Sequence, residues 1–238
     1  MNRMFLGVLF ASAIGNIANA GTITTIAQNT GTTVNAIDLT GFSTNGAGMT
    51  GMTVSALFGG GTVTCIWAPT GIDSGGCSGL AAGVGSFAVS QSGDTFSSNW
   101  TLTNTTAVGA APIPLLRILF DGITGSTVFD RTFGGLTGTN GSALGADATG
   151  TTPAGQPNGS ATYIDLVSTL GNPPVGDIFG RLSIDFGNGL LPQGAATWVA
   201  DTDTIGLRGG GNTPEPGTWA MLLLGGSALL GVRRLKRR

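Results

Sequence analysis

The sequence predicts an all-β fold, an antiparallel β-sandwich of the jelly-roll type, for the middle of the chain. Apolar and polar residues alternate in several short runs, which is the pattern of a strand with one buried face. Gly-rich turns separate these runs at short intervals. Between the two ends of the chain, the sequence lacks a sustained apolar period of 3.6 residues, which would indicate a helix.

The clearest alternation lies at 178–186, where the polar positions include Arg181 and Asp185. Its apolar residues share one predicted face and are Ile178, Leu182, Ile184 and Phe186. The run 114–120 differs, because it is apolar on both faces and has Arg117 as its one charge. That composition is typical of a central strand covered on both sides.

Two further runs alternate and carry tryptophan. In 62–67 the predicted inward side chains are Val63, Cys65 and Trp67, and in 96–103 they are Phe96, Trp100 and Leu102. Exposed aromatic rings can stack on sugars, but the alternation favours a core position for Trp67, Trp100 and Trp198.

Weaker strand patterns and one long loop complete the middle of the chain. The loop is predicted at 134–160, which is rich in Gly, Thr, Ala, Asn and Pro. The weaker strands are expected at 34–39, 51–58, 85–90, 126–133, 161–167 and 195–200.

The first twenty residues, 1–20, have the form of a secretory signal peptide. Arg3 supplies the positive charge, and an apolar stretch follows at 4–14. Ala18 and Ala20 give the small-x-small pattern that signal peptidase cleaves, so the mature chain is expected to begin at Gly21. The folded ectodomain is then predicted at 21–209.

The C-terminus combines three features in order. A linker, 210–216, contains Pro214, Glu215 and Pro216, and the two prolines favour an extended backbone. The next sixteen residues, 217–232, are uncharged and predict a short transmembrane helix of about 24 Å, against a hydrocarbon core of about 30 Å. A basic tail, 233–238, is expected to stay in the cytoplasm, and its charges are Arg233, Arg234, Lys236, Arg237 and Arg238.

This order, over 213–237, resembles the PEP-CTERM sorting signal of exported bacterial proteins. The resemblance implies a Gram-negative bacterium whose exosortase recognises Pro214-Glu215-Pro216 and removes the helix and tail. It also places such proteins at the cell envelope, on the outer surface or outside the cell, often with exopolysaccharide and biofilm, after a transient stay in the inner membrane. An ordinary single-pass anchor is the alternative reading of the same residues.

Two cysteines, Cys65 and Cys77, are the only ones in the chain. An even count in an exported protein predicts one disulfide between them. The alternative, a metal pair, lacks further ligands of the usual kind.

Composition restricts the chemistry. The chain has no His, and its single Lys is Lys236 in the tail, so His-based triads, lysine nucleophiles and His-containing zinc sites are excluded. The ectodomain has four Arg and eleven Asp, a net charge of about −7, which does not suit nucleic acid. We therefore expect no enzyme and no catalytic residues, although a pair of Asp carboxylates remains a conceivable acid–base arrangement.

Asp201 and Asp203 are candidates for calcium, with Asp185 or Asn188 expected nearby. Asp is also common in turns, where it bonds its own backbone, and that interpretation needs no cofactor. The sequence thus leads to two hypotheses, neither of which requires a cofactor: a non-enzymatic protein of the cell surface or matrix, or an extracellular glycan-binding module, with or without calcium.

Overall fold

The computed structural model describes residues 19–29, 33–41, 44–109, 111–131, 145–168 and 176–207. These residues form strands joined by turns and two short 3-10 helices, which confirms the all-β class. The 3-10 helices are η1 (Gly46–Met49) and η2 (Ile123–Gly125). The strands are β1 (Ala20–Asn29), β2 (Val34–Gly41), β3 (Thr53–Phe58), β4 (Gly61–Ile66), β5 (Ala68–Pro69), β6 (Ser74–Ala81), β7 (Gly85–Ser92), β8 (Trp100–Asn104), β9 (Leu115–Asp121), β10 (Thr127–Asp130), β11 (Thr149–Ala154), β12 (Gly159–Ser168), β13 (Ile178–Leu190), β14 (Ala195–Val199) and β15 (Asp201–Leu207).

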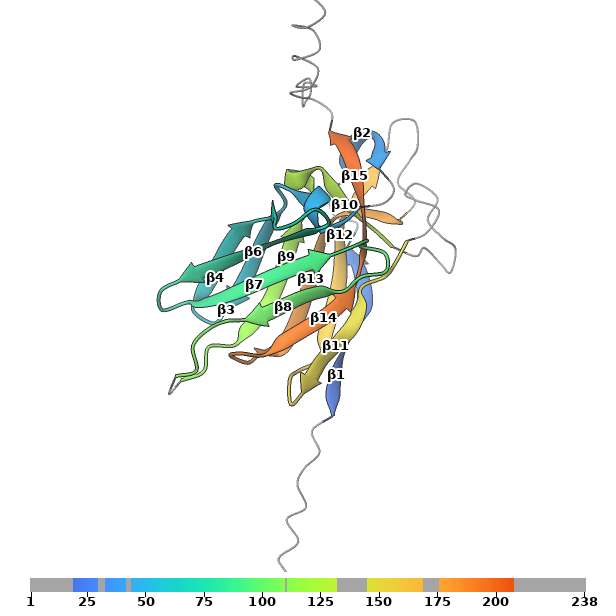
Figure 1. Cartoon of the computed structure of the whole chain (residues 1–238). Helices are drawn as coiled ribbons and strands as arrows, with labels where there is room; N and C mark the ends of the chain where they lie inside the picture. Colours follow the sequence, from blue (N-terminus) through green and yellow to red (C-terminus); the bar gives the residue numbers. More distant parts are fainter. Residues whose placement is uncertain are drawn as a thin grey trace, which may run out of the picture.

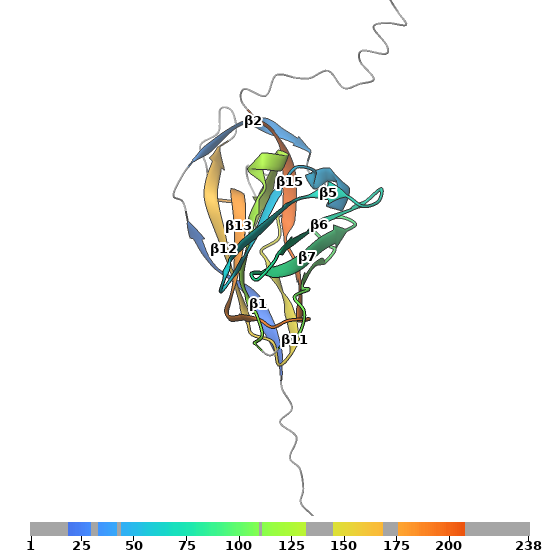
Figure 2. The ribbon, with the colours of Figure 1, turned by 90° about the vertical axis from the view of Figure 1, so that its left-hand side faces the viewer.

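All of these strands belong to one curled sheet. Its order is β4-β3-β9-β13-β10-β15-β2-β12-β1-β11-β14-β8-β7-β6-β5, with an additional pairing of β13 with β12. In Figure 1, β6, β7, β8 and β14 lie in front of β3, β9 and β13. Figure 2 shows β12 and β13 on one side and β6 and β7 on the other. Only Trp67 separates β4 from β5, so the first and last strands of the order are consecutive along the chain.

The strand directions differ in part from the expected antiparallel arrangement. β12 pairs in parallel with β1 and with β2, whereas the other pairings are antiparallel. A parallel pair needs a long crossover, and the segment 42–158 lies between β2 and β12. Alternation of apolar residues identifies the buried face of a strand but says nothing about the direction of its neighbour.

The strongly patterned runs lie where the sequence places them. In β13 the side chains of Leu182, Ile184 and Phe186 are buried. β9 is central, between β3 and β13, and buries Ile118 and Phe120. The six weaker runs also coincide with strands, namely β2, β3, β7, β10, β12 and β14.

Two expectations about individual segments are wrong. Strand β11 lies inside the stretch 134–160, which was expected to be a loop, because its Thr and Gly residues give almost no apolar signal. Phe96 does not continue β8: it lies in a turn where the Asp94 carboxylate accepts a hydrogen bond from the Phe96 amide, and its side chain is 39% exposed.

The core is organised around three tryptophans. Trp67, Trp100 and Trp198 are fully buried, which confirms the core interpretation over sugar stacking for these rings. Trp100 on β8 contacts Trp67 and Phe120, each with 5.3 Å between ring centroids, and stacks on Trp198 at 6.1 Å. Because Phe120 comes from β9, the cluster joins the two sides of the curled sheet.

Cys65 of β4 and Cys77 of β6 form the predicted disulfide. The segment that joins them includes Trp67 and β5, so the bridge lies where the two ends of the sheet meet. The disulfide therefore links the first part of the sheet to the last.

The terminal predictions lie mostly outside the described residues. These are the signal peptide up to Ala18, the Pro-Glu-Pro motif, the helix 217–232 and the basic tail. β1 begins at Ala20, so the predicted mature start at Gly21 falls on its second residue. Within the described ranges, no helix has the length and apolarity needed to cross a bilayer.

Candidate functional site: a buried carboxylate cluster

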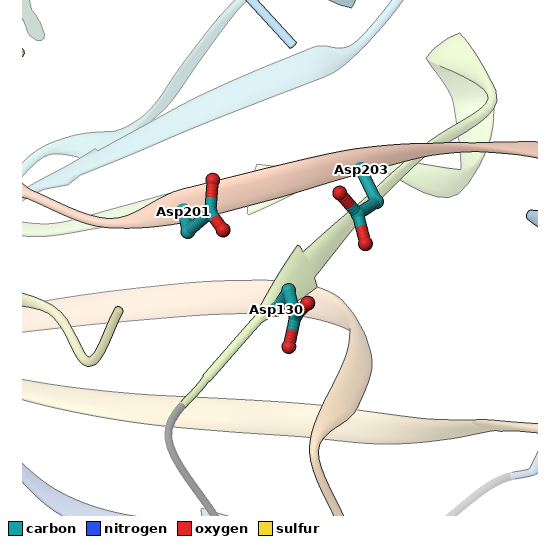
Figure 3. Close-up of side chains that lie close together, drawn as sticks. All are labelled: Asp130, Asp201 and Asp203. Carbon is teal, nitrogen blue, oxygen red and sulfur yellow. The ribbon is translucent and has the colours of Figure 1, made fainter. Parts of the chain in front are cut away.

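Three aspartates from two neighbouring strands bring their carboxylates together (Figure 3). Asp201 and Asp203 lie two residues apart on β15 and therefore point to the same face. Asp130 is the last residue of β10 and pairs directly with Asp201 in the antiparallel register. One carboxylate oxygen from each lies within 4.8 Å of the other two. We call Asp130, Asp201 and Asp203 the carboxylate cluster.

The cluster is buried. Asp130 and Asp203 are 0% exposed and Asp201 is 3% exposed. The segment 145–148 crosses beside it: the Ala146 amide donates to the Asp130 carbonyl, and the Asp201 amide donates to the Ala146 carbonyl. A Cβ added to Gly145 would lie 2.7 Å from Asp130 Oδ1, so only glycine allows the backbone to approach this closely.

That crossing segment is held from the other side by Arg131 and Tyr163. The Arg131 guanidinium donates to both carboxylate oxygens of Asp147 at 3.0 Å, and lies 5.2 Å from the centre of the Tyr163 ring. The Tyr163 hydroxyl accepts a hydrogen bond from the Ala148 amide at 2.8 Å. Burial raises the pKa of Tyr163, so its hydroxyl keeps its proton.

Asp201 has two hydrogen bonds of its own. Its Oδ1 accepts from the Thr202 amide at 2.8 Å and from the Thr95 hydroxyl at 3.1 Å. Thr95 is itself buried in the turn before β8, and its amide donates to the Thr44 carbonyl. These contacts connect the cluster to the turn between β7 and β8, the strands that lie in front in Figure 1.

The electrostatics of the cluster favour neutralisation. Burial, together with the neighbouring Asp203 charge, raises the pKa of Asp201 to about 7, although the hydrogen bonds from Thr95 and Thr202 oppose the shift. The three arginines among the described residues form ion pairs outside the cluster: Arg117 with Asp185, Arg131 with Asp147 and Arg181 with Asp165. A proton or a cation can offset the charge that three buried carboxylates share.

The arrangement suits ion or proton binding better than hydrolysis. A glycosidase needs its two carboxyl groups on either side of a bond that the substrate brings to them, and these carboxylates do not reach the surface. Calcium takes six to eight oxygen ligands, of which the cluster can supply at least three.

The sequence identified two of the three members. Asp130 was missed, because its approach to Asp201 depends on the register of β10 against β15. The expected neighbour Asp185 is elsewhere: its carboxylate binds Arg117 and accepts from the Gly187 amide on the outer face of β13. Asn188 is an exposed residue of the same strand.

The chain was compared with protein families, curated proteins and solved structures, and the function of the cluster is inferred from its geometry alone. No protein-family model, curated protein or solved structure matches the chain.

Proposed function

We propose that this chain is an exported, non-enzymatic protein of the cell surface or extracellular matrix, associated with exopolysaccharide. Signal peptidase removes 1–20, and an exosortase processes the C-terminus at Pro214-Glu215-Pro216. In this proposal the curled sheet is a β-sandwich of the jelly-roll type, and the helix 217–232 anchors the precursor transiently.

The observation that carries the proposal is the Cys65–Cys77 disulfide. Disulfides persist in oxidising compartments outside the cytoplasm, which agrees with a chain that begins like a secretory precursor. The absence of His from the sequence and of Lys from 21–209 adds support for a structural rather than a catalytic role.

The test is the intact mass of the protein recovered from the outside of its native cells. We expect a mass that lacks residues 1–20 and the segment after about residue 214. A matched variant with Pro214, Glu215 and Pro216 replaced by alanine should keep its C-terminus. A wild-type mass that still includes Arg238 would contradict processing, and retention of the protein in the cytoplasm would contradict export.

The carboxylate cluster favours a second candidate, a glycan-binding module that depends on calcium. A bound calcium ion would offset the repulsion among Asp130, Asp201 and Asp203 and would fix β10 against β15. The test is binding to a glycan panel with calcium and with a chelator, for the wild type and for Asp130→Asn. Binding that the chelator and the variant both abolish supports this candidate, whereas no binding, or binding unaffected by the chelator, contradicts it.

A further inference from the structure

The two ends of the curled sheet meet at a ladder that is shorter than the ladders of β4 with β3 and of β6 with β7. Among the described strands β4 pairs only with β3, through six residue pairs, and β6 pairs with β7 through eight. The ladder that closes the sheet is the short one between β5 and β6, with the two pairs Ala68↔Gly76 and Pro69↔Gly75. The disulfide crosses the same boundary. We call the contact of β4 and β5 with β6 the seam.

Glycines on β6 allow close packing at the seam. A Cβ on Gly79 would lie 2.8 Å from Val63 Cγ1, and a Cβ on Gly75 would lie 2.3 Å from Trp67 Nε1. Trp67 lies between β4 and β5 along the chain, and its Nε1 donates to the Gly46 carbonyl at 2.7 Å. The seam therefore depends on side-chain packing, one short ladder and one covalent bond.

We propose that the Cys65–Cys77 disulfide is a redox-operated latch, and that its reduction opens the seam locally while the rest of the curled sheet stays folded. The bond restrains two strand edges that are otherwise connected by the two-pair β5–β6 ladder and by side-chain packing. On their other sides β4 and β6 keep long ladders to β3 and β7. Loss of the cross-link returns conformational freedom to the segment between the cysteines. We expect this segment to move at the seam, where β5 can separate from β6.

The chemistry needs a dithiol reductant. Its thiolate attacks one sulfur of the bridge, a mixed disulfide forms, and the second thiol of the reductant then releases the protein. The protein gains two electrons and two protons as two thiols, and the reductant leaves as its own disulfide. Both cysteines are partly exposed, so the reductant can reach the bridge in the folded protein.

The experiment is amide hydrogen exchange of the purified protein with and without dithiothreitol. Reduction should speed exchange in 66–69 and 74–77 by roughly a hundredfold. Exchange in β12 and β13, which pair on the far side of the sheet, should change by less than about twofold. The double variant Cys65→Ser/Cys77→Ser should exchange rapidly at the seam in either condition, and its rates should not respond to the reductant.

Two results would overturn the latch. Unchanged exchange at the seam after complete reduction, verified by mass, would mean that packing alone holds the sheet closed. Acceleration spread equally over β12 and β13 would mean that the disulfide supports the whole fold and that no local opening exists. Both readouts use the isolated protein, so they do not depend on whether the chain is exported.

Discussion

Asp201 is buried beside Asp203, and its pKa is raised to about 7 from an ordinary value of 3.8. The folded protein therefore binds this proton more tightly than the unfolded chain does. The stability contributed by the protonated group is fully present below about pH 4 and is lost as the pH rises to about 7. A slope of up to about 1.4 kcal/mol per pH unit follows from one such group.

Substitution Asp201→Asn should remove this pH dependence. Asparagine resembles the protonated acid and keeps an oxygen that accepts from the Thr202 amide. We expect the variant to be more stable than the wild type near neutral pH in the presence of a chelator, by about 1–3 kcal/mol. Urea unfolding at several pH values measures this, and a constant difference between the two proteins from about pH 4 to about pH 7 would contradict the assignment.

A second residue-level prediction concerns Gly150 on β11. A Cβ at this position would lie 2.0 Å from the Thr197 carbonyl oxygen and 2.5 Å from Trp198 Cα on the neighbouring strand. Gly150→Ala should therefore lower the free energy of unfolding by about 2 kcal/mol or more, because backbone must move to admit the methyl group. Gly59→Ala is the matched control, since nothing lies within 4 Å of the added atom. Equal thermal stabilities of the two variants would show that β11 and β14 are not packed as described.

At the scale of elements, the ion pairs differ in what they connect. Arg131, which directly follows β10, binds Asp147 through two nitrogens and also donates to the Gln28 side chain of β1. The pair of Arg117 on β9 with Asp185 on β13 is about half exposed. The Arg131–Asp147 pair positions the segment 145–148 beside the carboxylate cluster. The Arg117–Asp185 pair lies on the outer face of two strands that already share a ladder.

Replacing Arg131 and Arg117 by lysine, one at a time, should show which ion pair contributes more to stability. Arg131→Lys loses the two-pronged contact and the packing over Tyr163, so we expect a cost of about 1–2 kcal/mol in unfolding free energy. Arg117→Lys should cost less than about 0.5 kcal/mol, because exposed ion pairs contribute little. Chemical denaturation of both variants tests this, and a larger loss from Arg117→Lys would reverse the interpretation.

Elements with strong apolar alternation were predictable, and Thr- and Gly-rich ones were not. β13 can be predicted from the sequence because Leu182, Ile184 and Phe186 alternate with polar residues over a long run. β11 reads Thr-Gly-Thr-Thr-Pro-Ala and buries only Thr152, so a sequence pattern based on apolar side chains passes over it. Its place between β1 and β14 comes from tertiary pairing.

The candidate site shows the same limit. Asp201 and Asp203 stand out because their spacing puts two carboxylates on one face of a strand. Asp130 lies far away in the sequence, and only the register of β10 on β15 brings it opposite Asp201. The sequence likewise gave no sign that these acids are buried, since aspartate is usually an exposed residue.

At the scale of the whole molecule, β1 starts at the bottom of the folded part and β15 finishes at its top (Figure 1). Two of the three arginines among the described residues, which are trypsin cleavage sites, lie in strands: Arg117 in β9 and Arg181 in β13. We expect the native protein to resist cleavage at both, because a protease needs the strand to leave its ladder first. Digestion in increasing urea, followed by mass spectrometry, should show these cuts only as the protein unfolds. Fragments from Arg117 or Arg181 in native buffer would contradict the ladders of β9 and β13.

The meeting of β4 and β5 has a consequence for crowded conditions. An open sheet presents edge strands that can recruit further chains and grow into cross-β fibrils. Here only Trp67 separates the first and last strands of the described sheet, and the Cys65–Cys77 disulfide holds β4 beside β6, so the chain itself covers these edges in the closed form. We therefore expect the closed form to resist joining edge to edge at high local concentration, which the proposed place at the cell surface or in the matrix requires.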